Sequence, residues 1–398
     1  MYKVMAVNCG SSSLKYKLYE MPEERVLCSG LAERIGHDDG IFKIKFDGKE
    51  DKRVLPIPDH AVAVNLVLEA LTKFGIVKSL DEIKCVGHRV VQGGKYFSHS
   101  VDFDDESEAI IAKLIPLDPL HAPAHLVGYH AFKDALPEVP AIAVFDTAFH
   151  QTMEEEDYLY PIPYEWSQEY DCRRYGAHGT SHQYLANKVI KEYLGGKANS
   201  RIITCHIGSG ASLAAVRDGK CVATTMGLTP LGGVMMGTRT GDMDPSVTDY
   251  LATCTGLDVH QLYDIFNKKS GLLGVSGISN DTRDIEAAAL EGNERAILTS
   301  NLFARRVADF IGSYFVRLGG ADMMVFSAGI GENSPYYRRL ILERVEEALG
   351  LKIDYKLNES IYGGKEAVIS LPGSSMIVAV IPTDEEVMIA RDCYKRIA

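Results

Sequence analysis

The sequence predicts an α/β fold with two lobes, and three observations support this prediction. The chain has 398 residues, more than one ordinary hydrophobic core accommodates, so two domains are expected. Short apolar runs alternate along it with amphipathic helical stretches, which is typical of sheets covered by helices. A strand–loop–strand unit also occurs near the start of each half. A duplicated chain of this kind implies two lobes that face each other across a cleft.

The individual elements follow from local patterns, taken in chain order. Apolar runs bounded by turn residues predict strands at residues 3–7, 13–19, 25–31, 83–87, 141–145, 201–206, 323–326 and 376–381. Helical stretches are predicted at about 60–73, 181–193, 296–318 and 384–397. Prolines at 116–123 and 161–163 mark breaks between elements.

The repeated unit contains a tight Gly/Ser loop in each copy. In residues 4–18 the loop is Asn8-Cys9-Gly10-Ser11-Ser12-Ser13, and in residues 202–216 it runs from His206 to Ser212. The second copy closes with an Asp218-Gly219 hairpin turn. Such loops direct backbone N–H groups and hydroxyls to one point, which suits a phosphate oxygen. Two short matches also arise by chance, so an unduplicated chain remains the alternative.

A third glycine-rich segment spans residues 327–334, after a predicted strand and before a predicted helix. Glycine-rich backbone at a helix N-terminus is a ready site for an anion or a nucleotide. Each loop by itself could be an ordinary turn, but three of them in one α/β chain favour phosphate binding. The sequence contains no G-x-x-x-x-G-K-[ST], no H-R-D and no G-x-G-x-x-G motif. The familiar P-loop, protein-kinase and dinucleotide folds are therefore disfavoured.

Composition excludes several classes of partner. The formal net charge of -12 argues against nucleic acid, whose phosphates require a basic surface. The eight cysteines include no C-x-x-C, so neither a zinc knuckle nor a redox dithiol is predicted. The first residues lead straight into a predicted strand, so no signal peptide is expected, and the apolar runs are too short to cross a bilayer. A cytoplasmic protein without a membrane partner is expected.

Two arginines are candidates for binding an anionic substrate, and one aspartate is a candidate cleft residue. Arg89 follows the predicted strand 83–87, and Arg239 lies among Gly and small residues at 236–241. Arginine in such a setting is typical of bidentate carboxylate or phosphate recognition, the alternative being a solvated surface residue. Asp146 ends the strand 141–145, where an acid points into a cleft in open α/β sheets. A helix N-cap is its alternative.

Two histidine pairs have the i, i+4 spacing of a metal site. His178 and His182 lack the intervening Glu of H-E-x-x-H, so zinc is disfavoured. His121 and His125 share the spacing, but Pro123 lies between them, which predicts a loop.

These residues belong to a set of motifs that resembles the acetate kinase family over essentially the whole chain. The motifs are Asn8-x-Gly-Ser-Ser-Ser-x-Lys15, Gly87-His88-Arg89-Val90-Val91, Pro119-Leu120-His121, Phe145-Asp146-Thr147-Ala148-Phe149-His150, His178-Gly179-Thr180-Ser181-His182, Met236-Gly237-Thr238-Arg239, Ser279-Asn280-Asp281, Gly329-Ile330-Gly331-Glu332-Asn333 and Pro382-Thr383-x-Glu385-Glu386.

The resemblance implies the duplicated two-lobed fold of the actin, sugar-kinase and heat-shock ATPase superfamily, which is ribonuclease H-like. It implies an N-terminal lobe of residues 1–149 closed by a C-terminal helix at 384–398. The second lobe, residues 150–383, would bind nucleotide and form a homodimer. Trp166, the only tryptophan, is interpreted as a packing or interface residue.

The implied activity is reversible, direct in-line transfer of the ATP γ-phosphoryl group to acetate, giving acetyl phosphate and ADP. Asn8 and Glu385 would lie near Mg²⁺, for which Mn²⁺ is an alternative. Arg89 would bind the carboxylate, while His178 and Arg239 would stabilise the transferring phosphoryl group, and Asp146 is the family's catalytic acid. The implied methyl-group pocket consists of Val91, Leu120, Ala177 and Pro230. The implied contacts to ATP or ADP are Lys15, His206, Ile207, Gly208, Ser209, Gly210, Asp281, Thr282, Arg283, Gly329, Ile330, Gly331, Glu332 and Asn333.

The chain departs from the family pattern at four positions. It has Ser209 and Ala122 where the family has Asn, Gln92 where it has His, and Ala177 where it has Phe. Ser209 concerns a contact to ATP, and Ala177 concerns the preferred length of the acyl chain.

The chemistry of the acceptor bears on the role of Asp146. A carboxylate is already ionised at about pH 7, so transfer needs no general base. Asp146 is therefore interpreted as orienting an arginine or a Mg²⁺-bound water. Two alternative functions remain: a kinase for propionate or another short carboxylate, and a non-catalytic nucleotide-dependent clamp or filament. Arg89, His178 and Arg239 argue against a clamp, which needs no carboxylate site.

Overall fold

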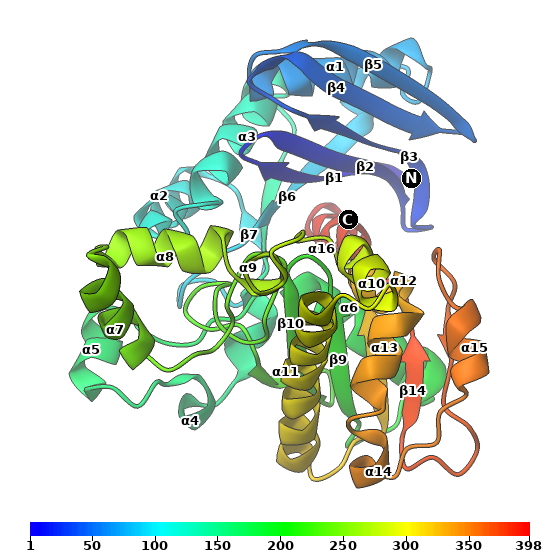
Figure 1. Cartoon of the computed structure of the whole chain (residues 1–398). Coiled ribbons are helices and arrows are strands. Elements are labelled where there is room, and N and C mark those ends of the chain that lie inside the picture. The colour runs from blue at the N-terminus through cyan, green and yellow to red at the C-terminus, as the bar shows by residue number, and fades with distance from the viewer. The chain divides into compact units, whose positions relative to one another are not determined.

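A computed structural model describes the whole chain, Met1–Ala398, which divides into two compact units. Unit 1 consists of Met1–Phe149 and Asp384–Ala398, and unit 2 consists of His150–Thr383. Figure 1 shows the elements of each unit along the colour gradient from the N-terminus to the C-terminus. No helix is both long and apolar enough to cross a membrane.

Unit 1 is built on one mixed sheet of eight strands in the order β5-β4-β3-β2-β1-β6-β8-β7. Its strands are β1 (Tyr2–Gly10), β2 (Ser13–Met21), β3 (Arg25–Glu33), β4 (His37–Phe46), β5 (Lys49–Ile57), β6 (Ile83–Val90), β7 (Val101–Asp102) and β8 (Ala141–Phe145). Its α-helices are α1 (His60–Lys73), α2 (Asp105–Lys113), α3 (Ala122–Ala135) and α16 (Glu385–Ile397).

The two faces of this sheet pack against different helices, and the side chains of β6 point alternately to one face and the other. A Cβ on Gly87 would meet Ile389 and Cys393 of α16. His88 packs instead against Phe132 of α3. Because successive side chains of a strand point to opposite faces, Arg89 lies on the same face as Gly87, toward α16.

Unit 2 has a six-stranded sheet in the order β11-β10-β9-β12-β14-β13. Its strands are β9 (Arg201–Ile207), β10 (Ala211–Arg217), β11 (Lys220–Thr224), β12 (Met323–Ser327), β13 (Ala367–Val368) and β14 (Ile377–Val380). Its α-helices are α4 (Glu155–Tyr158), α5 (Tyr164–Glu169), α6 (Gly179–Lys188), α7 (Ser246–Thr255), α8 (Val259–Lys268), α9 (Gly271–Ser276), α10 (Thr282–Leu290), α11 (Glu294–Leu318), α12 (Ala328–Asn333), α13 (Pro335–Leu342), α14 (Glu346–Leu349) and α15 (Tyr355–Ser360).

The two sheets repeat one topology. The order β3-β2-β1-β6-β8 in unit 1 corresponds strand by strand to β11-β10-β9-β12-β14 in unit 2. In both, the first three strands are antiparallel neighbours and the next two join in parallel. The expected α/β class and its duplication are therefore confirmed, and the unduplicated alternative is wrong.

Several expected elements need correction. The β4–β5 hairpin was missed, because its strands carry many charged residues and lack an apolar run. The loop expected around Pro123 is wrong: α3 begins at Ala122, and proline fits a first helical turn, where its missing N–H is not needed. Strand β6 continues to Val90, so Arg89 lies within it rather than after it. Within the segment 327–334, Ser327 ends β12 and residues Ala328–Asn333 form the short helix α12.

His88 is a buried histidine that is unfavourable to protonate. It is 2% exposed, its ring contacts Phe103, Tyr129 and Phe132 edge-on, and its Nε2 has no hydrogen-bond partner. Burial, and then the neighbouring His125, lowers its pKa from 6.5 to about 3. Between those values the unfolded chain binds a proton that the folded chain excludes, so stability falls as the pH falls through this window.

We expect His88→Phe to make unfolding less sensitive to acid. One pKa unit corresponds to about 1.4 kcal/mol, so at pH 5 His88 costs roughly 2 kcal/mol of stability relative to neutral pH. A phenyl ring would fit among the three aromatic neighbours without that cost. Denaturant unfolding near pH 7.5 and pH 5 measures the difference, with the exposed His99→Gln as the matched control. Equal losses of stability in the wild type and His88→Phe would contradict this assignment.

Candidate active site

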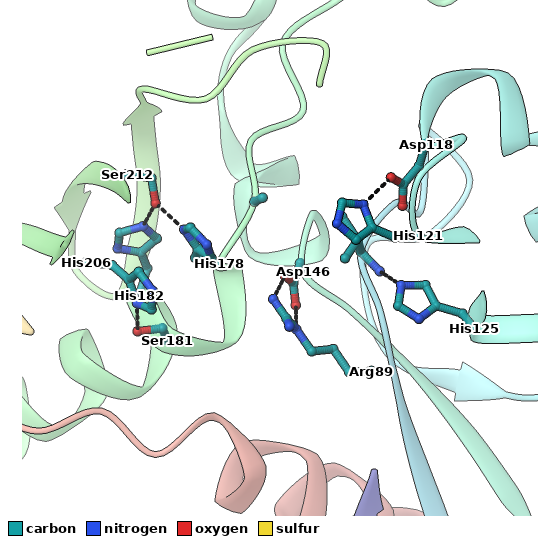
Figure 2. Close-up of polar contacts among 12 residues, drawn as sticks. Arg89, Asp118, His121, His125, Asp146, His178, Ser181, His182, His206 and Ser212 are labelled. Atoms are coloured by element: carbon teal, nitrogen blue, oxygen red, sulfur yellow. Dashed lines mark hydrogen bonds and ion pairs between the residues drawn. The ribbon is translucent and has the colours of Figure 1, made fainter. Parts of the chain in front are cut away.

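Arg89 and Asp146 form a bidentate ion pair in unit 1. They come from adjacent parallel strands, Arg89 from β6 and Asp146 directly after β8. Arg89 Nε donates to Oδ1 at 2.9 Å and Nη2 donates to Oδ2 at 2.6 Å. The Asp146 side chain is 0% exposed and that of Arg89 is 17% exposed. Figure 2 shows the two side chains meeting fork to fork, the geometry that fixes a guanidinium most tightly.

The ion pair keeps Arg89 positively charged. Burial by itself would lower the pKa of Arg89, but the negative charge of Asp146 has the larger effect, with smaller contributions from Glu385 and Glu386. The pKa of Arg89 is therefore raised above its ordinary value. Arg89 is thus a mostly buried, oriented cation and not a solvated surface arginine. Both carboxylate oxygens of Asp146 accept from it, so the carboxylate orients Arg89.

The start of α16 is fixed by contacts that the sequence analysis missed. Asp384 caps the helix by accepting from the Val387 N–H at 3.2 Å. Lys17 of β2 bridges Asp384 at 3.0 Å and Glu386 at 3.1 Å. Glu385 lies between these two anchored acids and acts on the charge of Arg89. The motif with two glutamates after Pro382 allowed Glu385 to be predicted as a site residue, but no motif or local pattern predicted the contacts of Lys17.

Asn8 and Glu385 are compatible with a shared Mg²⁺ ion. Asn8 pairs with Lys15 across the first hairpin, and α16, which begins at Glu385, packs against β1 and β2. No cluster of three or more His, Cys, Asp or Glu side chains could hold a metal by itself. Mg²⁺ prefers oxygen ligands and is often held by one or two protein groups together with substrate phosphates and water. The amide and carboxylate oxygens present fit that mode of binding.

His125 on α3 holds the backbone around Val91. Its Nδ1–H donates to the Cys9 carbonyl at 3.0 Å, and its Nε2 accepts from the Val91 N–H at 3.3 Å. Burial lowers its pKa to about 4, which keeps Nε2 an acceptor. Val91 is thereby fixed and 7% exposed, whereas Leu120 is 42% exposed. The incorrect loop assignment hid this role of His125.

In unit 2, His178 and Arg239 converge on the second Gly/Ser loop. His178 is the N-cap of α6 with a left-handed φ of 57°, a strained conformation that is frequent at functional sites. A Cβ added to Gly210 would lie 3.5 Å from His178 Nε2 and 3.9 Å from Arg239 Nη1. Gly237, two residues before Arg239, donates its N–H to the Ser209 carbonyl at 3.0 Å. The loop thus lies beside one imidazole and one guanidinium, as a phosphate site requires.

A cavity of about 500 Å³ is lined in part by Ser209 of this loop, and its volume is typical of small-molecule sites. It brings together several predicted ATP contacts, among them Ser209, Thr282 and Ile330. The complete lining is Ser209, Asn280, Asp281, Thr282, Arg283, Glu286, Gly329, Ile330, Asn333 and Ser334.

Two residues of this lining, Asn280 and Ser334, were not predicted as ATP contacts although they lie in or next to the family motifs. Asn280 belonged to a quoted motif, and Ser334 directly follows another. Ser334 donates to the Glu286 carboxylate at 3.1 Å, and burial raises the pKa of Glu286. No motif pointed to Glu286, which lies within the helix α10.

Seven predicted ATP contacts are not among the residues that line the cavity: Lys15, His206, Ile207, Gly208, Gly210, Gly331 and Glu332. Ile207 is 0% exposed in the hydrophobic core of unit 2. The Glu332 carboxylate accepts from the Ala328 N–H at 2.7 Å and the Thr383 N–H at 3.1 Å. A Cβ on Gly331 would lie 3.4 Å from the backbone of Phe326, so Gly331 allows close packing. Ile207, Gly331 and Glu332 thus serve the packing and backbone contacts of unit 2.

Of the residues predicted for the methyl-group pocket, Val91 and Leu120 belong to unit 1, and Ala177 and Pro230 belong to unit 2. Ala177 is 3% exposed and belongs to the hydrophobic core of unit 2. Its carbonyl accepts from His150 Nε2 at 2.9 Å. The Pro230 carbonyl accepts from Arg239 Nη1 at 3.4 Å, which ties Pro230 to the arginine.

Comparisons with known proteins show the family to which the chain is similar. The chain matches the acetokinase family over residues 3–391. It is 52% identical to acetate kinases of Bacillus cytotoxicus and Bacillus subtilis, with 99% of each chain covered.

Two solved structures are similar along their whole length. One is acetate kinase from Porphyromonas gingivalis, with TM-score 0.92, 44% identity and 99% of each chain covered. The other is a propionate kinase from Francisella tularensis, with TM-score 0.93, 38% identity, and 99% of this chain and 100% of that chain covered. The chain therefore belongs to the acetokinase family.

Proposed function

We propose that this protein transfers the γ-phosphoryl group reversibly between ATP and acetate, forming acetyl phosphate and ADP. The observation that carries the proposal is the convergence of His178 and Arg239 on Gly210, in a loop whose Ser209 also lines the nucleotide-sized cavity. Curated relatives 52% identical over 99% of the chain are named acetate kinase. The names of these relatives and the geometry of the loop point to the same chemistry.

The proposed mechanism depends on position and charge rather than on a covalent intermediate. Arg89, held by Asp146, binds the acetate carboxylate, which is already ionised and needs no base. Arg239 and His178 donate to the phosphoryl oxygens as charge develops in the transition state. Bound Mg²⁺, or Mn²⁺, would be held by Asn8 and Glu385 and would neutralise phosphate charge. Lys15, the loop from His206 to Gly210 and the lining of the cavity would hold ATP.

The test is ATP synthesis from ADP and acetyl phosphate in the presence of Mg²⁺, with ATP measured by luminescence. The reverse direction is tested with ATP and acetate, and hydroxylamine traps the acyl phosphate. The proposal expects both products. ADP and free phosphate without an acyl phosphate would contradict it and would favour the nucleotide-dependent clamp.

The length of the acyl chain is a separate question, because the family's Phe is replaced by Ala177. Acetate is the proposed substrate, and propionate is proposed as a good second one. A methyl group in place of a phenyl ring leaves space for extra methylenes, and each is worth roughly 1–3 kcal/mol in an apolar pocket. The competing possibility is that the surrounding core fills this space, since Ala177 is 3% exposed.

We expect Ala177→Phe to lower kcat/KM for propionate at least about tenfold relative to acetate. Both substrates are measured with both proteins, and the thermal midpoint is recorded. An unchanged ratio together with a lower midpoint would mean that the ring overpacks the core and that Ala177 does not set chain length.

We further propose a homodimer formed through unit 2, located in the cytoplasm. Large apolar and aromatic side chains are exposed on α5, α7 and α8: Tyr164 56%, Trp166 53%, Tyr250 67% and Val259 59%. Contiguous exposed apolar surface is typical of protein interfaces. All eight cysteines are free, as in a reducing compartment.

A further inference from the structure

His178 is the end of a buried chain of hydrogen bonds that runs back into the sheet of unit 2. Its Nδ1 lies 2.8 Å from Ser212 Oγ, and the same hydroxyl lies 2.8 Å from His182 Nε2. His182 Nδ1 in turn lies 2.7 Å from Thr204 Oγ1. Ser212, His182 and Thr204 are all 0% exposed. Figure 2 shows Ser212 beside His178.

Thr204, at the inner end of this chain of hydrogen bonds, sets which group donates in each bond. The Thr204 hydroxyl has one proton and lies near two groups, His182 Nδ1 at 2.7 Å and the Ala214 carbonyl at 3.4 Å. O–H donors prefer separations of about 2.5–3.0 Å, and donation to the Ala214 carbonyl at 3.4 Å is longer than this. We therefore assign the Thr204 proton to the shorter contact, with His182 Nδ1 as its acceptor.

His182 is neutral and therefore carries a single ring proton. Burial, and then the neighbouring His150 and His206, lowers its pKa well below 6.5. Because Nδ1 accepts from Thr204, the proton lies on Nε2 and is donated to Ser212 Oγ. The Ser212 hydroxyl is then left to donate its own proton to His178 Nδ1. The Nδ1 of His178 is thus an acceptor, and a neutral His178 carries its proton on Nε2.

We propose that Thr204, His182 and Ser212 are positioning residues that hold His178 as a neutral imidazole protonated on Nε2, which donates to the transferring phosphoryl group. This inference rests on the proposed function for the identity of the acceptor. The nitrogen concerned is the one that faces the Gly210 loop. In the opposite tautomer a lone pair of His178 would point at phosphoryl oxygens and repel them.

A neutral donor also suits the surroundings of His178. Arg239 Nη1 approaches the same point above Gly210, and the His206 ring stacks on His178 with centroids 4.1 Å apart. A second positive charge on His178 would be unfavourable beside Arg239. The chain of hydrogen bonds provides the N–H without that charge, since protonating Nδ1 would require every bond in it to reverse.

The direct test is the tautomer of His178 in the free protein. Nitrogen-15 spectra of protein labelled only in histidine distinguish protonated from unprotonated ring nitrogens, and His178→Gln assigns the signals. Near neutral pH we expect His178 to be protonated on Nε2 alone. In Ser212→Ala a mixture of tautomers should appear. As a control, Ser181→Ala removes the hydroxyl that contacts His206 Nδ1 at 2.7 Å and should leave the His178 signals unchanged.

Kinetics provide the second readout. Ser212→Ala should lower kcat roughly 10- to 100-fold, less than loss of a whole donor, with the KM values for acetate and ATP unchanged. Ser212→Thr restores a hydroxyl at the same position and should recover most of kcat. Equal thermal midpoints in the three proteins show that folding is intact.

Two results would overturn the inference: His178 protonated on Nδ1 in the wild type, or a Ser212→Ala variant with unchanged kcat. Failure of the proposed function is distinguishable, because the spectra are recorded without substrate. If the protein formed no acyl phosphate but His178 had the expected tautomer, the hydrogen-bond chain would be supported. Only the phosphoryl group, as the acceptor of the His178 Nε2–H, would then be wrong.

Discussion

Arg239→Ala is expected to lower kcat by about 10²- to 10³-fold while changing the KM for acetate little. Its guanidinium lies beside Gly210 and His178, so its contact strengthens as charge develops on the phosphoryl group. Arg89→Ala should lose activity to a similar extent but also raise the KM for acetate, because the carboxylate is bound in the ground state. The two variants should therefore differ in how the loss divides between kcat and KM.

Steady-state kinetics with acetate and ATP varied separately measure this division. Arg295→Ala is a matched control in unit 2, since that arginine bonds the Val275 carbonyl and has no proposed role in the site. Near-wild-type constants for both Arg89→Ala and Arg239→Ala would contradict the assignment of the site. If the KM for acetate rose in Arg239→Ala but not in Arg89→Ala, Arg239 would be the residue that binds the carboxylate and Arg89 the one that stabilises the phosphoryl group.

Asp146→Asn is expected to lower kcat/KM by about 10²-fold through Arg89, because removal of one partner releases an oriented arginine. The amide can accept only one of the two hydrogen bonds, at 2.9 Å and 2.6 Å, that Arg89 donates. Breaking a buried pair also costs on the order of 3 kcal/mol of stability. Raising the Mg²⁺ concentration should not rescue the variant, since both oxygens of Asp146 serve Arg89.

The measurement compares wild type and Asp146→Asn over a Mg²⁺ series and a pH series, with denaturant unfolding of both. Rescue by Mg²⁺ would assign Asp146 to a metal-bound water. Complete loss of activity in Asp146→Asn, with a wild-type rate that follows titration of a carboxyl group, would support a general base.

Local sequence patterns predicted eight of the fourteen strands and four of the sixteen α-helices. Helix α1 begins and ends where its periodicity predicts, at His60 and Lys73, and β8 matches its apolar run. The β4–β5 hairpin escaped prediction because its charged strands are defined by the pairing of β4 with β3 and of β5 with β4, rather than by their own apolar content. Proline in the first turn of α3 was taken for a break because sequence alone does not tell a helix start from a loop.

The sequence by itself determined the α/β class, the repeated loops and the residue types of the site, because each depends on short segments or on motifs within them. Only the tertiary structure decided which of these residues meet. Arg89 and Asp146 are 57 positions apart and become partners through the parallel pairing of β6 with β8. His182 and Thr204 join Ser212 because α6, β9 and β10 pack together. Such contacts depend on strand order and register across the sheet, which no local pattern encodes.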